Sequence, residues 1–195
     1  MPKVWKILSY ATGTVFFSYS LGVYYLNLRI QTIPPEKLPR GMSIQKITPT
    51  KGNYIPYVDT FCTTVNGDST KNLQERFING IGLRSALKGF NVEIISSQQD
   101  QGFSSFVYKW NWKNPKLVDF FNQLANYGYP YRLQSGGYHE LYIERTEKKD
   151  FFNIFFASAH EYEDFHDSKI LPGLFLHLHT TYAKVLLLWS YSKSH

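Results

Sequence analysis

The residues with the clearest chemical potential are two histidines near the C-terminal end of the chain. His177 and His179 are separated by one residue and lead into the apolar stretch TTYAKVLLLWSY. On a strand, the two imidazoles would share a face and could bind one metal ion. The segment follows Pro172 and a glycine and is too long for one strand, so we favour a helix. Residues two apart on a helix point about 200° away from each other, and we therefore expect no shared metal site.

As a helix, this segment turns one histidine toward the protein core. The residues expected near that face are Phe175, Leu178, His179, Tyr182, Leu186 and Trp189. His177 and Lys184 are expected on the outer face. Two interpretations stay open for the inward histidine: a hydrogen-bonded core residue, or a residue that contacts a bound ligand. His179, Tyr182 and Trp189 are therefore candidate ligand-binding residues.

His139 is the fourth candidate ligand-binding residue. It follows Gly136–Gly137, which we expect to be a hairpin turn between strands at 129–135 and 138–146. Strand alternation places His139 on the same face as Leu141 and Ile143 and on the opposite face from Glu140. We therefore expect His139 to reach the interior.

No other cluster of residues indicates catalysis, a cofactor or a metal. The segment HEYEDFH at 160–166 combines two histidines with several carboxylates, but its spacing matches no established metal site, and we interpret it as a solvated loop. The sequence contains no GxSxG, Walker, GxGxxG or HExxH motif. We assign no catalytic residue, although an enzyme with a cavity can lack a sequence motif.

An uncharged segment of 22 residues lies between Lys6 and Arg29. As a helix it would be about 33 Å long, which is enough for the apolar core of a bilayer of about 30 Å. We expect a transmembrane anchor, with a cleaved signal peptide and a buried soluble helix as alternatives. Thr14, Ser18 and Gly22 recur at every fourth position, and such small residues could admit a partner transmembrane helix.

The charge of the chain is concentrated near its N-terminus. Residues 1–52 hold seven Lys or Arg and one acid, whereas residues 53–195 hold equal numbers of basic and acidic residues. A basic segment beside an apolar one is typical of contact with membrane lipid, and the balanced remainder does not indicate nucleic-acid binding. The hydroxyl-rich N-terminus without early acids favours a mitochondrial membrane, with the endoplasmic reticulum as the alternative. Cys62 is the single cysteine, which excludes an intramolecular disulfide.

The chain divides into an anchor at 1–30, a proline-rich linker at 31–53 that we expect to be a stalk, and a globular domain at 54–195. The domain begins with a strand at 54–65, followed by a helix at 70–81 with an apolar stripe of Leu73, Phe77 and Ile81, and by a second short helix at 83–90. Further strands and a helix at 115–127 precede the closing helix, and the apolar face expected for the helix at 115–127 consists of Leu117, Phe120, Phe121 and Leu124. Strands in hairpins with separate helices indicate an α+β fold with an antiparallel sheet on a long C-terminal helix.

This order of elements resembles that of START-like, or helix-grip, domains. The segments GGYHELYIE, FFASA and LHTTYAKVLLLWSY are similar to the closing half of that fold, and the helix at 115–127 departs from it. The chain also resembles small fungal membrane-anchored proteins of unknown function. The resemblance covers about 140 residues and implies a lipid or another small apolar ligand in an internal cavity. The alternative function is a non-catalytic structural or assembly subunit of a membrane complex.

Overall fold

The computed structural model describes residues 2–47, 49, 52–55, 58–79, 87–100, 102–163 and 169–192. Its helices are α1 (Pro2–Arg29), α2 (Thr70–Asn79), α4 (Lys116–Asn126) and α5 (Gly173–Ser192), with 3-10 turns η1 (Pro35–Lys37), η2 (Ile44–Lys46) and η3 (Leu87–Gly89). Its strands are β1 (Gln31–Thr32), β2 (Asn53–Tyr54), β3 (Val58–Asn66), β4 (Phe90–Gln99), β5 (Phe103–Trp112), β6 (Gly136–Arg145) and β7 (Phe151–Glu163). These elements confirm an α+β fold with an antiparallel sheet and a long C-terminal helix.

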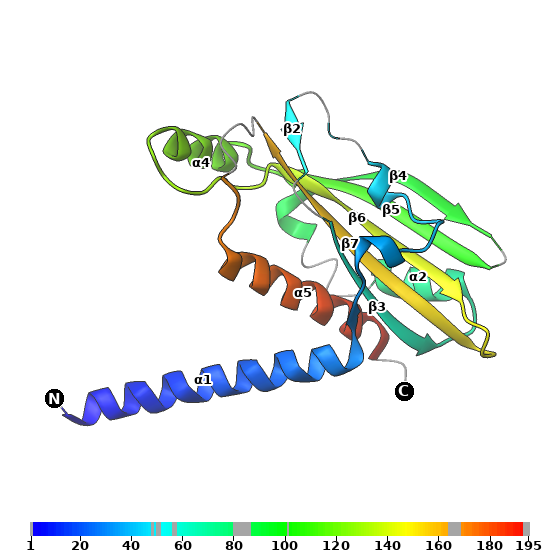
Figure 1. Ribbon diagram of the computed structural model, residues 1–195, viewed down its shortest axis with the longest axis horizontal. Helices are drawn as coiled ribbons and strands as arrows, with labels where there is room; N and C mark the ends of the chain where they lie inside the picture. The colour runs from blue at the N-terminus through cyan, green and yellow to red at the C-terminus, as the bar shows by residue number, and fades with distance from the viewer. Residues whose placement is uncertain are drawn as a thin grey trace.

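The sheet has the strand order β1-β3-β7-β6-β5-β4, and β2 pairs with the end of β7. All of these pairs are antiparallel. Because side chains alternate along a strand, the even-numbered residues from Phe152 to His160 share one face of β7. The main core forms on that face, where Phe61, Leu141 and Phe156 are buried under α2, α5 and the end of α1. Figure 1 shows α5 lying between the sheet and α1.

The helix α2 forms where the sequence pattern predicts it. Ser69 caps its N-terminus, since Oγ accepts a hydrogen bond of 3.2 Å from the backbone N–H of Asn72. Leu73 and Phe77 are one turn apart and almost fully buried, so the apolar stripe faces the sheet. The remaining member of the predicted stripe, Ile81, lies outside the described residues, as does the first half of the short helix predicted at 83–90; Leu87–Gly89 form η3, and Phe90 begins β4.

The proline-rich segment packs on the opposite face of the sheet and does not form the stalk predicted for it. Met42 and Ile44 are buried there against β6 and β7. The Glu140 carboxylate accepts backbone hydrogen bonds from Ser43 at 2.9 Å and from Ile44 at 2.7 Å, and a hydroxyl hydrogen bond from Ser105 at 2.9 Å. These donors compensate for the burial of a charged group and fix η2 on the sheet.

The predicted transmembrane helix is wrong. No helix among the residues that the structure describes combines the length and the apolarity that a bilayer crossing requires. The physical reason is composition, because α1 contains many Ser, Thr, Tyr, Gly and Asn residues that dilute its apolar ones. The C-terminal end of α1 instead packs on the protein: Leu26 and Ile30 join the main core, and Tyr19 Oη lies 3.2 Å from Thr181 Oγ1 of α5.

The small residues Thr14, Ser18 and Gly22 are exposed on α1. A Cβ atom added at Gly22 would meet no atom within 4 Å. The packing of a partner helix against this stripe therefore stays a prediction from the sequence. The membrane in which that packing was expected is no longer part of the prediction.

The predicted hairpin turn at Gly136–Gly137 is also wrong, because both glycines are the first residues of β6. A Cβ at Gly136 would collide with the carbonyl oxygen of Trp110, and a Cβ at Gly137 would collide with that of Ala159. Close approach of neighbouring strands, and not a turn, therefore requires the two glycines.

The helix predicted at 115–127 is present as α4, and Gly128 follows it with a positive φ of 100°, as expected for the residue after a helix. Its apolar face differs from the prediction. Val118 and Ala125 are buried, whereas Phe120, expected on that face, is 54% exposed. The reason is position, since Figure 1 places α4 at one end of the sheet and not across it.

Candidate functional site

A cavity of about 110 Å³ lies between α5 and the helix-covered face of the sheet. Four strands and the loop before β6 supply Phe90, Tyr108, Trp110, Gln134, His139 and Phe156. The helix α5 supplies His179, Tyr182, Ala183 and Leu186. None of these side chains is Asp, Glu, Lys or Arg. The cavity is therefore aromatic, with a few neutral polar groups.

The spacing of residues on α5 explains its share of the cavity. His179, Tyr182, Ala183 and Leu186 follow the pattern i, i+3, i+4, i+7, which places them on one helix face. Ala183 and Leu186 are buried, whereas Tyr182 is 45% exposed. The cavity therefore reaches the protein surface at Tyr182.

The structure brings three of the four predicted ligand-binding residues together. His179 and Tyr182 line the cavity from α5, and His139 lines it from β6. Trp189 does not: it is 48% exposed. Trp189 is seven positions after Tyr182, so it lies on the same flank of the helix but about 10.5 Å further along, beyond so small a cavity.

Of the two residues predicted on the outer face of α5, His177 is exposed as expected and Lys184 is not. His177 is exposed and lies edge-on to Tyr19 of α1, with ring centroids 6.1 Å apart. Lys184 is only 8% exposed, because α1 covers that side of the helix. Its ammonium group donates a 2.8 Å hydrogen bond to Oδ1 of Asn27. Burial lowers the pKa of Lys184, and the carboxylate of Asp59 acts in the opposite direction.

The sequence analysis missed Trp110 and Gln134 of the cavity lining and, beside the cavity, His160. The Nε2 atom of His160 is 2.9 Å from Nε2 of His179, and Ser158 Oγ lies 3.2 Å and 3.3 Å from the same two nitrogens. The prediction of a solvated loop at 160–166 is wrong for 160–163, because β7 continues to Glu163. The signal was the absence of any Gly or Pro that would end the strand between Phe151 and Glu163. Residues 164–166 lie outside the described residues.

Burial keeps the three histidines of this site uncharged. Desolvation lowers the pKa of His139 to about 3, and the nearby His179 contributes to the same shift. Desolvation also lowers the pKa of His179 to about 4 and that of His160 well below its ordinary value. At neutral pH each imidazole therefore offers one N–H donor and one nitrogen acceptor.

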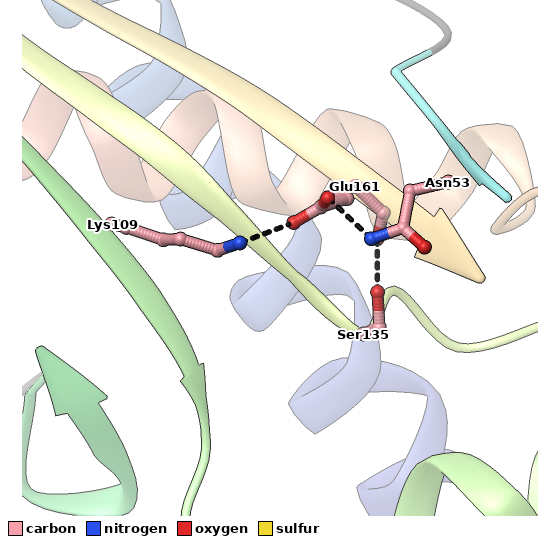
Figure 2. A network of polar contacts seen from close by, with 4 residues as sticks. All are labelled: Asn53, Lys109, Ser135 and Glu161. Carbon is pink, nitrogen blue, oxygen red and sulfur yellow. Dashed lines mark hydrogen bonds and ion pairs between the residues drawn. The ribbon is translucent and has the colours of Figure 1, made fainter. Parts of the chain in front are cut away.

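A separate polar network lies at the end of β7 on the opposite face of the sheet. Lys109 Nζ is 3.3 Å from Oε2 of Glu161, and the amide of Asn53 donates to Oε1 of the same carboxylate. Ser135 donates its backbone N–H to the carbonyl oxygen of Glu161 at 2.9 Å. Figure 2 shows the four side chains converging from β2, β5, β7 and the loop before β6. Burial by itself lowers the pKa of Lys109, but the charges and hydrogen bonds of Glu161 and Tyr138 together outweigh it and raise the pKa overall. We interpret this network as structural, since each group is paired.

No group of three or more His, Cys, Asp or Glu in the described part of the chain is arranged to hold a metal ion. The His160–His179 pair is therefore best described by its hydrogen bonds. The arrangement can bind a small uncharged molecule through aromatic contacts and hydrogen bonds.

Comparison with known proteins identifies no family for this chain. No protein-family model matches the sequence, and no curated protein matches it. Among solved structures, the chain is similar to a hypothetical protein from Helicobacter pylori whose crystal structure was determined at 1.88 Å resolution. The two share 9% sequence identity with a TM-score of 0.41, over 82% of this chain and 96% of the other. A similarity this distant supports no argument about fold or function.

Proposed function

We propose that the protein binds a small, mainly apolar molecule between α5 and the sheet. The observation that supports this most directly is the cavity of about 110 Å³, which aromatic and apolar side chains line without any charged residue. Concave apolar sites with a few convergent polar groups are the usual form of ligand pockets. The proposal assigns no reaction to the site.

The size of the cavity narrows the expected ligand. Benzene occupies an engineered apolar cavity of about 150 Å³ in another protein. A cavity of about 110 Å³ that opens at Tyr182 suits a single ring with one edge at the mouth. It is too small to enclose a whole acyl chain. We therefore propose a compact ligand in place of the lipid expected from the sequence.

The test uses benzene as the probe and the full chain as the protein. Ala183 is almost fully buried and lines the cavity, so Ala183→Leu should fill the space that the ring would occupy. Val185→Leu is the matched control, because Val185 lies on the same helix, is 37% exposed and does not line the cavity. Backbone NMR titration should show benzene binding to the wild type and to the control, with affinity reduced at least about tenfold in Ala183→Leu.

Two results would count against the proposal. One is the absence of benzene-induced shifts at residues of α5 and β5 in the wild-type protein. The other is equal binding to the wild type and to Ala183→Leu in a folded variant, which would place the probe elsewhere.

A further inference from the structure

We infer that the ligand of this cavity is an uncharged planar ring that carries both a hydrogen-bond acceptor and a hydrogen-bond donor. The inference rests on the proposed function and adds the polar groups of the ligand. Three buried side-chain atoms of lining residues have no hydrogen-bond partner in the described part of the chain: Nε1 of Trp110, Oε1 of Gln134 and Nδ1 of His139. The indole N–H is a donor, the Gln134 oxygen is an acceptor, and a neutral imidazole nitrogen can be either, so a ligand with both functions matches them.

The indole of Trp110 is held firmly in the wall of the cavity. Its side chain is 4% exposed and packs edge-on against Phe90, with ring centroids 4.8 Å apart. A Cβ added at Gly137 would lie 2.9 Å from Nε1, so the glycine leaves room for the indole. The neighbouring Trp112 faces the same region but donates its Nε1–H to the backbone oxygen of Gln134 at 2.8 Å. The indole N–H of Trp112 therefore has an acceptor within the protein, whereas the indole N–H of Trp110 is available to a ligand.

Gln134 complements this donor. Its backbone oxygen is used by Trp112, whereas its side-chain oxygen is buried beside the cavity without a donor from the described residues. A buried polar atom without a partner is rare in folded proteins and needs an explanation. A ligand N–H or O–H directed at this oxygen would supply it.

The cavity selects against charged ligands. No Asp, Glu, Lys or Arg lines it, and the imidazoles of His139 and His179 are uncharged at neutral pH because burial lowers their pKa values. An ionic ligand would lose its hydration without meeting an opposite charge. A neutral ligand does not face this penalty.

The walls of the cavity favour a flat ligand. His139 is stacked on Phe156 with an interplanar angle of 11° and ring centroids 5.2 Å apart. Trp110 is stacked near His139 at 21° and 6.1 Å. These nearly parallel rings present flat surfaces, against which a planar ring makes more contact than a branched aliphatic group.

The test compares single-ring probes of similar shape with the full chain. Benzene carries no polar group, 2-pyridone and 4-pyridone carry a carbonyl and an N–H at adjacent or opposite ring positions, and benzoate and benzamidinium carry opposite charges. The chain has four tryptophans, so Trp110→Phe identifies the Trp110 indole N–H signal in NMR spectra. We expect one of the pyridones to bind roughly tenfold more tightly than benzene, equal to about 1.4 kcal/mol, and to shift the Trp110 N–H signal downfield.

Two variants then test whether the preference for a pyridone over benzene depends on Nε1 of Trp110 and on Oε1 of Gln134. Trp110→Phe and Gln134→Met should each bring the affinity for the pyridone close to that for benzene. Trp189→Phe is the control, because Trp189 is half-exposed on α5 and does not line the cavity, and it should keep the preference. The shift of the Trp110 signal in the wild-type protein provides the test if either variant fails to fold.

The outcomes separate the inference from the proposed function. If no probe binds, including benzene, the proposed function is wrong and the inference falls with it. If benzene binds as tightly as both pyridones, the cavity binds apolar rings only, and its polar atoms are hydrated; the inference is then wrong while the proposed function stands. Tightest binding by benzoate or benzamidinium would also overturn the inference, as would a pyridone preference that Trp110→Phe and Gln134→Met leave intact.

Discussion

The buried histidines should make the protein sensitive to mild acid. The ordinary pKa of 6.5 is lowered to about 3 for His139 and to about 4 for His179. Below about pH 6.5 the unfolded chain binds a proton at each imidazole, whereas the folded protein does not until about pH 4 or below. Stability should therefore fall as pH falls through this window and level off below the folded pKa values.

The magnitude follows from the size of each shift. At about 1.4 kcal/mol per pKa unit, complete titration lowers the free energy of unfolding by roughly 5 kcal/mol through His139 and by roughly 3 kcal/mol through His179. His160 acts in the same direction. Because domains of this size are stable by about 5–15 kcal/mol, we expect acid unfolding at about pH 4–5.

Guanidinium unfolding followed by tryptophan fluorescence, between about pH 7.5 and about pH 5, measures this dependence. His139→Phe removes one titrating group and keeps a flat ring against Phe156, so the slope of stability against pH should fall by about 1.4 kcal/mol per pH unit. His177→Gln is the matched control, because it removes an exposed histidine from α5 without touching the cavity. Equal slopes for the wild type and His139→Phe between about pH 6.5 and about pH 5 would refute the reasoning.

Three further predictions concern the fold. Gly137→Ala should lower the free energy of unfolding by about 3 kcal/mol or more, because its Cβ collides with the carbonyl oxygen of Ala159. Gly22→Ala, on the exposed face of α1, should instead raise the free energy of unfolding by about 0.5–1 kcal/mol, and equal effects of the two substitutions in chemical denaturation would contradict this reasoning. Glu140→Leu should lower stability by about 3 kcal/mol, because it leaves two backbone N–H groups and a hydroxyl without their acceptor; a loss below about 1 kcal/mol would argue against the role of this carboxylate. Burial raises the pKa of Cys62 to about 12, so native protein should react with iodoacetamide far more slowly than unfolded protein at pH about 8, and equal rates would contradict the burial.

Local patterns predicted several elements correctly because their causes are local. Leu73 and Phe77 recur at helical spacing after the cap at Ser69, and α2 forms there. Gly128 ends α4 because a left-handed conformation is accessible to glycine. The inward position of His179 followed from the helical period of its own segment.

Other predictions failed where neighbouring strands decide the outcome. A Gly-Gly pair such as Gly136–Gly137 is typical of a turn. In the structure both glycines lie in a strand that requires glycine there, because a Cβ would collide with the carbonyl oxygens of Trp110 and Ala159. His160 has polar neighbours typical of a loop, but pairing with β6 extends β7 past it. Lys184 was expected in solvent, and α1 covers it. Each error arose from a contact with a segment distant in the sequence.

The sequence by itself determined the α+β class, the closing helix and the inward placement of three of the four candidate residues, because side-chain periodicity within one element shows which face is apolar. Only the tertiary structure decided that His139 and His179 line one small cavity, that His160 contacts His179 beside it, that Trp189 lies beyond it, and that Trp110 and Gln134 bring buried polar atoms to its wall. The tertiary structure also showed that the C-terminal end of α1 and the proline-rich segment pack on the protein, where the sequence had indicated a membrane anchor and a stalk. Periodicity orients a side chain on its own element, whereas the register of strands and the docking of helices determine which side chains meet.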